Sequence, residues 1–158
     1  MSNDSKSLGT LQVRLRNLQR IVPINLVDLE KFAAKAVRLC LQLRKSKATD
    51  LTKLGEISIL FVTDSRMASL HRKFLNQSGA TDVLTFHHGE IVISTETARR
   101  NARAFDNSLS RELQLYIVHG LLHLHGFDDR TQSSAQKMET MQERILCQAI
   151  AAAVYERR

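Results

Sequence analysis

The stretch of residues 113–124 constrains the fold most, because it is apolar on almost every side when it is drawn as a helix. One stripe holds Ile117, Gly120, Leu121 and Leu124, and the opposite side holds Leu115, Val118 and Leu122. A helix of this kind is buried in the core. It nevertheless carries His119 and His123, and buried imidazoles need partners for their ring nitrogens. A metal ion with hydrogen-bond acceptors behind the histidines would supply those partners.

The spacing of these histidines indicates a metal site. Side chains four residues apart on a helix lie one above the other, so both rings can reach a point about 2.0–2.1 Å from each nitrogen. Gly126 follows three residues later and favours the left-handed backbone that ends a helix, so that Asp129 can return as a third ligand. Three protein ligands leave the fourth position of a tetrahedral ion open, as in catalytic sites. His125 points away from His123 and is expected to support the site or lie at the surface.

The same spacing matches the zinc-binding pattern of metzincin proteases, His-x-x-x-His-x-x-Gly-x-x-Asp. Those enzymes carry a glutamate directly after the first histidine, where it acts as the general base. Gly120 occupies that position here. A metalloprotease therefore stays an alternative that lacks its base.

Two blocks of the sequence resemble the YbeY family of metal-dependent endoribonucleases. The first is Val-His-Gly-Leu-Leu-His-Leu-His-Gly-Phe-Asp-Asp at 118–129, which is similar to the family signature H-G-x-L-H-L-x-G-Y-D-H. The second comprises 80–86 (Ala-Thr-Asp-Val-Leu-Thr-Phe) and 89–94 (Gly-Glu-Ile-Val-Ile-Ser), similar to P-T-D-V-L-S-F and G-D-I-x-I-S. Two motifs in the right order are more specific than either alone, and the likeness extends over nearly the whole chain.

The resemblance implies a zinc-dependent endoribonuclease that cleaves single-stranded RNA and acts in ribosomal RNA maturation. One Zn²⁺ would be held by His119, His123 and Asp129. Residues of the second block would line the cleft, with Asp82 and Ser94 as catalytic candidates and Thr81 contacting RNA. Asp82 and Ser94 could equally be turn or strand-end residues with local hydrogen bonds.

Three positions depart from the family pattern. The family's third ligand is usually histidine, and Asp129 stands there in this chain; a carboxylate also binds zinc. The family usually has an arginine six residues before Thr81, where this chain has Leu75. Arg72, one helical turn earlier, is the candidate replacement for that charge, unless it is an exposed helix arginine. Ala80 replaces a proline and should affect only loop stiffness.

Length and composition agree with a single intracellular domain. With 158 residues and 43% hydrophobic residues the chain can build one packed core. Lys and Arg outnumber Asp and Glu by 23 to 16, and the resulting charge of +7 favours an anionic partner such as nucleic acid, although a basic pI also arises from composition alone. Two distant cysteines, no hydrophobic signal core and no apolar run of about 18 residues predict a cytoplasmic protein without a membrane segment.

The remaining pattern predicts an α+β fold. Strands are expected at 11–16, 56–62, 83–86 and 90–94, and helices at 25–44, from Asp64 or Ser65 to 74, at 95–105, from Ser108 or Ser110 to 124, and at 133–155. We therefore predict a single domain over 1–158, with 1–10 flexible and a mixed sheet of about four strands flanked by about five helices. The metal helix lies at its centre. Residues 44–50 should form a loop, whose basic part at 44–47 is expected to be solvated.

Several basic residues are candidates for RNA contacts. Arg99, Arg100 and Arg103 share one helix and could line a phosphate track, or face solvent. His87 and His88 could add metal ligands but are expected in an exposed loop. Three function classes thus remain: an endoribonuclease acting in ribosomal RNA processing and ribosome quality control, a metalloprotease, and a non-catalytic factor that binds RNA or the ribosomal subunit and holds a structural metal.

Overall fold

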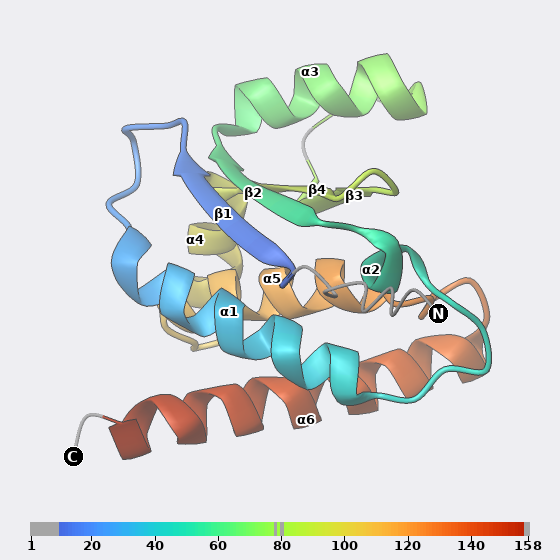
Figure 1. Cartoon of the computed structure of the whole chain (residues 1–158). Helices are drawn as coiled ribbons and strands as arrows, with labels where there is room; N and C mark the ends of the chain where they lie inside the picture. The colour runs from blue at the N-terminus through green and yellow to red at the C-terminus, as the bar shows by residue number, and fades with distance from the viewer. Residues whose placement is uncertain (1–9, 78, 80, 157–158) are drawn as a thin grey trace, which may run out of the picture.

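The computed structural model describes residues 10–77, 79 and 81–156. Four strands and six helices form in this part of the chain, in the order β1 (Gln12–Asn17), α1 (Leu26–Gln42), α2 (Asp50–Lys53), β2 (Glu56–Val62), α3 (Asp64–Leu75), β3 (Val83–Phe86), β4 (Glu90–Ser94), α4 (Thr95–Ala104), α5 (Leu109–Leu124) and α6 (Gln132–Glu156). Figure 1 shows their arrangement. The predicted α+β class is confirmed.

The strands form one mixed sheet in the order β1-β2-β4-β3. β1, β2 and β4 are parallel, and β3 runs antiparallel to β4. The β3–β4 hairpin turns at Gly89, whose φ of 100° suits glycine, and an added Cβ there would lie 2.9 Å from the Glu56 carbonyl oxygen. The sheet thereby confirms the predicted hairpin and the four mixed strands.

Helices cover both faces of the sheet. α3 lies on one face, α1, α4 and α5 lie on the other, and α6 forms a further layer outside α1 and α5 (Figure 1). A large apolar core fills the space between the sheet and α1, α5 and α6, and a smaller one lies under α3 around Met67 and Val92. This layering surrounds α5 with protein.

Helix α5 is the buried central helix that its composition predicts. It packs against α1, α4, α6 and the strands β3 and β4. Leu113, Ile117 and Leu121 are almost completely inaccessible to solvent. Gly120 faces the sheet, where an added Cβ would lie 2.8 Å from two side-chain atoms of Ile91. The glycine therefore allows α5 to approach β4 closely.

The structure corrects two details of the predicted elements. A sixth helix, α2, begins where the expected loop ends, and its single turn is closed by reciprocal hydrogen bonds between Thr49 and Thr52. One turn is too short to show a hydrophobic period, so the sequence pattern could not reveal it. Helix α3 is capped by Thr63 rather than by Asp64 or Ser65, whereas Ser108 caps α5 as expected.

Some predictions fall on residues that the structure does not describe. The expected flexibility of residues 1–10 concerns mostly residues 1–9, and the effect of Ala80 on loop stiffness also lies outside the described residues. Within the described helices, none combines the length and the apolar character that a membrane crossing requires.

Candidate metal centre

The two histidines of the motif lie together at the C-terminal end of α5. His119 and His123 face each other edge to face, with ring centroids 4.6 Å apart. Their Nε2 atoms are separated by 3.0 Å. The predicted stacking of the pair on one helix face is therefore present.

The turn after α5 brings a carboxylate to the same point. His125 ends the helix, Gly126 adopts the left-handed backbone with φ of 86°, and the Phe127 amide donates back to the Leu122 carbonyl. The chain then returns Asp129 to the histidines, and the three ligand atoms all lie within 4.8 Å of one another. Zinc ligands at 2.0–2.1 Å in a tetrahedron are separated by about 3.3 Å, so this set is close to a metal-binding arrangement.

The outer nitrogen of each imidazole is already occupied. Nδ1 of His123 lies 3.1 Å from the Phe127 carbonyl oxygen, which can only accept, so this nitrogen carries the hydrogen. Nδ1 of His119 lies 2.9 Å from Oε1 of Gln142 on α6 and donates to it in the same way. A neutral imidazole with its hydrogen on Nδ1 has only a lone pair on Nε2. Two lone pairs thus face each other, and a cation between them would turn this repulsion into coordination.

The electrostatics keep His123 in the form that binds metal. Burial and the neighbouring His119 lower the pKa of His123, while Asp129, the Phe127 carbonyl and Asp128 act in the opposite direction. The imidazole is therefore neutral near pH 7. The donor set of two imidazoles and one carboxylate fits a zinc ion with one open position.

A cavity of about 680 Å³ opens over the three candidate metal ligands. His119, His123 and Asp129 lie in its wall, together with three basic residues: Lys45, Lys47 and Arg130. The predicted solvated loop at 44–47 therefore borders the site. The sequence did not indicate Lys45 and Lys47 as site residues, because a run of charged residues does not show which part of the fold it faces. Arg130 could have been found from its position next to Asp129.

Comparison with known proteins identifies the family. The family profile described as Endoribonuclease YbeY matches residues 14–149. The chain belongs to the YbeY family. Two curated relatives named Endoribonuclease YbeY are 33% identical over 101 residues, in Phocaeicola vulgatus, and 40% identical over 111 residues, in Anaeromyxobacter sp.. These alignments cover 60% and 61% of this chain, and 73% and 58% of the respective relatives, so part of each relative's length lies outside the match.

A solved structure supports the fold. The solution structure of TM1509 from Thermotoga maritima superposes with a TM-score of 0.64 and 21% identity, covering 92% of this chain and 93% of that one. At this level of identity the similarity establishes a shared architecture. Function has to be argued from the site.

The structure places Leu75 in the wall of the metal cavity. It is the residue that stands where the resemblance to the YbeY motifs expects an arginine, and 51% of its surface is exposed. His87 also lines the cavity and contacts Asp50, with 2.7 Å between Nδ1 and Oδ2. Among the described residues, the group that could hold a metal consists of His119, His123 and Asp129, without His87.

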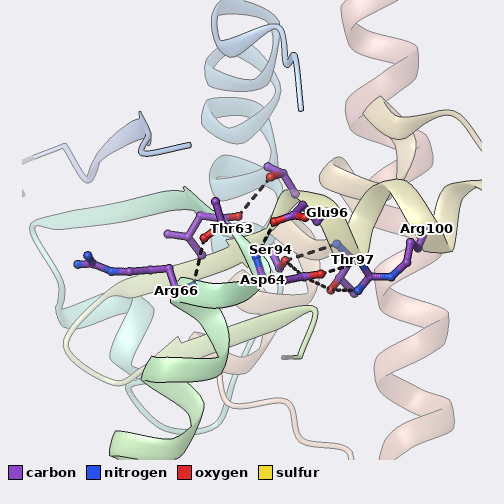
Figure 2. A network of polar contacts seen from close by, with 9 residues as sticks. Thr63, Asp64, Arg66, Ser94, Glu96, Thr97 and Arg100 are labelled. Atoms are coloured by element: carbon purple, nitrogen blue, oxygen red, sulfur yellow. Dashed lines mark hydrogen bonds and ion pairs between the residues drawn. The ribbon is translucent and has the colours of Figure 1, made fainter. Parts of the chain in front are cut away.

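The candidates of the second motif block form hydrogen bonds away from the metal cavity. Ser94 is fully buried, caps α4 and donates to Oδ1 of Asp64 at 2.6 Å (Figure 2). Asp82 accepts from the Val83 amide at 2.8 Å and from the Thr81 hydroxyl at 3.3 Å. All three lie outside the described lining of the metal cavity.

The predicted arginines also lie outside the described cavity lining. Arg100 forms an ion pair with Asp64, with 2.6 Å between Nη1 and Oδ2, as part of the network that joins the starts of α3 and α4 (Figure 2). Burial raises the pKa of Asp64, but hydrogen bonds from Arg100, Ser94 and Thr97 outweigh it and hold that pKa below its ordinary value. Arg72 is exposed on α3, and Arg99 is half-buried on α4. The structure therefore brings together the predicted metal ligands, but not the catalytic and RNA-binding candidates with them.

Proposed function

We propose that this chain is a metal-dependent endoribonuclease that cleaves single-stranded RNA, with one Zn²⁺ held by His119, His123 and Asp129. The observation that carries the proposal is the pair of Nε2 lone pairs 3.0 Å apart, both of whose Nδ1 atoms are occupied by oxygen acceptors. Membership of the YbeY family supports RNA as the substrate. Lys45, Lys47 and Arg130 in the cavity wall offer positive charges to an anionic substrate, beside the carboxylates of Asp50, Asp128 and Asp129.

The residues around the site have separate roles in this proposal. When bound, the ion supplies Lewis-acid chemistry, which polarises a phosphoryl oxygen and makes water more acidic. Gln142 and the Phe127 carbonyl orient the imidazoles and keep Nε2 unprotonated. Lys45, Lys47 and Arg130 attract the RNA backbone into the cavity.

We also propose ribosomal RNA as the physiological substrate, with a role in its maturation and in ribosome quality control. The support is the resemblance of both sequence blocks to the YbeY motifs and the formal charge of +7. Action on ribosomal RNA would bring the protein to the ribosomal subunit in the cytoplasm.

Peptide hydrolysis is less well supported. The residue after the first histidine would have to offer a carboxylate to the metal site, but position 120 faces Ile91 in the sheet and has no room for a side chain. A non-catalytic RNA-binding factor has one observation in its favour. Leu75 places an apolar side chain in the cavity wall where the resemblance expects a charge that could stabilise the transition state.

The test combines metal analysis with cleavage of a labelled single-stranded RNA. The unaltered protein should carry one zinc per chain and cleave the RNA but not casein, and His123→Ala should abolish both metal and cleavage. His88→Ala serves as the matched control, because His88 is exposed and lies outside the described cavity lining. Bound zinc and RNA binding without cleavage would refute the nuclease and favour the non-catalytic factor.

A further inference from the structure

We propose that the loop between α1 and α2 forms the phosphate-binding edge of the metal cavity, and that His125 is the positioning residue that holds this loop in place. The inference rests on the proposed function, since it assigns the residues that grip the RNA backbone at the same site. It concerns Lys45 and Lys47, which line the cavity together with the metal ligands.

The first observation is the unusual set of contacts made by His125. His125 lies at the end of α5 and is only 1% exposed. Nε2 lies 2.8 Å from the Leu43 carbonyl oxygen, which can only accept, so Nε2–H is the donor. Nδ1 then accepts the hydroxyl hydrogen of Thr49 at 2.9 Å. Both nitrogens of this buried ring are therefore bonded to the loop, across 82 and 76 residues of sequence.

The two contacts enclose the basic segment. Leu43 is the residue after α1 and Thr49 is the N-cap of α2, so Lys45 and Lys47 lie between the two points that His125 holds. Thr49 also packs near Gly126, where an added Cβ would lie 3.5 Å from the threonine methyl group. The tether consequently links the basic loop to the same turn that carries the third metal ligand.

The second observation is the packing of Lys45 onto that turn. Its Nζ lies 3.7 Å from the ring centroid of Phe127, the residue whose carbonyl oxygen accepts from His123. Burial and the neighbouring Lys137 lower the pKa of Lys45, while Asp128 raises it. The Lys45 ammonium group is thus held against Phe127 at the cavity wall, where it can pair with an RNA phosphate.

The size of the expected effect follows from counterion release. For single-stranded nucleic acid, the logarithm of the binding constant falls by about 0.7 per phosphate contact for each tenfold increase in salt. If binding at 1 M salt is taken as the reference, the loss of one contact weakens binding at 0.1 M salt about fivefold. It also reduces the slope of the logarithm of the binding constant against the logarithm of the salt concentration by about 0.7. Two lost contacts weaken binding about 25-fold.

The experiment measures RNA binding, cleavage and metal content on the zinc-loaded protein. A fluorescein-labelled single-stranded RNA is mixed with each variant, binding is followed by stopped-flow anisotropy before cleavage, and KM and kcat are taken from the cleavage that follows. K45Q and K47Q should each raise Kd and KM about fivefold, with kcat and zinc content unchanged. K53Q is the matched control, because Lys53 is an exposed lysine of α2 outside the described cavity lining, and K45R should restore binding.

The role of His125 is tested by a double-mutant cycle. H125L should weaken binding by nearly as much as K45Q and K47Q combined, and adding both lysine substitutions to it should have little further effect, because the loop is already released. Thermal unfolding checks that H125L is folded. T49V, which removes only the hydroxyl contact, provides the same test if H125L does not fold.

The outcomes separate this inference from the proposed function. If the unaltered protein cleaves RNA, but K45Q, K47Q and K53Q all bind RNA equally well, the loop assignment is wrong and the nuclease proposal is unaffected. Additive effects of H125L and the lysine substitutions would overturn the positioning role. If K45Q and K47Q weaken RNA binding but the unaltered protein does not cleave RNA, the loop assignment is supported and the nuclease proposal is refuted. If the unaltered protein does not bind RNA, both proposals are refuted.

Discussion

Substituting alanine for Gly120 tests the close approach of α5 to the sheet. The new Cβ would lie 2.8 Å from both Cδ1 and Cγ2 of Ile91, and 3.1 Å from its Cγ1. Ile91 is completely buried in β4, which has strands on both sides. Because Cγ2 is attached directly to the β-carbon of a packed strand residue, rotation of the isoleucine cannot clear all three contacts.

The expected magnitude is the difference between two effects. Overpacking a core by one methyl group costs about 1–3 kcal/mol. Alanine is better than glycine in a helix by about 1 kcal/mol, which opposes that loss. The free energy of unfolding should therefore fall by about 1 kcal/mol, and the melting temperature by about 2–4 °C for a domain of this size.

Urea unfolding of a double-mutant cycle with Ile91→Ala checks this reasoning. Ile91→Ala alone should lower the free energy of unfolding by about 2–5 kcal/mol because it leaves a cavity. In that background Gly120→Ala meets none of the three isoleucine atoms, so it should become stabilising by about 1 kcal/mol. The reasoning is refuted if Gly120→Ala stabilises the otherwise unaltered protein, since the methyl group would then have found free space.

Three further outcomes are expected. His123→Ala should lose the bound zinc seen by native mass spectrometry and slow RNA cleavage at least about a hundredfold, because loss of even an outer partner of a metal ligand costs about 10–100-fold; His88→Ala should do neither. The folded-state pKa of Asp64 lies below the ordinary value of 3.8, so the ionised carboxylate stabilises the fold above pH 3.8, and this stabilisation is lost as the pH falls through the folded-state pKa. Asp64→Asn should therefore lower the melting temperature near pH 7 and flatten the decline of the melting temperature in acid. An unchanged decline in acid would contradict this prediction. Burial raises the pKa of the Cys40 thiol to about 12, whereas Cys147 is exposed, so iodoacetamide should label one cysteine in the native protein and two after unfolding, as counted by mass spectrometry.

The candidate metal group could be predicted because the information is local. His119 and His123 are one helical turn apart, and Gly126 ends that turn, so short-range geometry alone brings Asp129 back to them. The central position of α5 was predictable for a related reason, since a helix that is apolar on all sides has to be covered by other elements.

The other candidate residues show where local reasoning ends. Ser94 and Arg100 were considered for catalysis and RNA binding, but tertiary packing brings the start of α3 beside α4, where both contact Asp64. The charge of Arg100 is thereby engaged with a carboxylate 36 residues away in the chain. A pattern of residue types carries no information about such a neighbour.

The sequence by itself predicted most of the secondary structure, the mixed sheet and the candidate metal group, because periodicity, capping and helix spacing act over a few residues. Only the tertiary structure decided which charges face the ligands. It placed Lys45, Lys47 and Leu75 in the cavity wall and bonded His125 to the Leu43 carbonyl oxygen and the Thr49 hydroxyl. Contacts across 76 and 82 residues depend on how whole layers pack, and that packing is set by the complete core rather than by any segment.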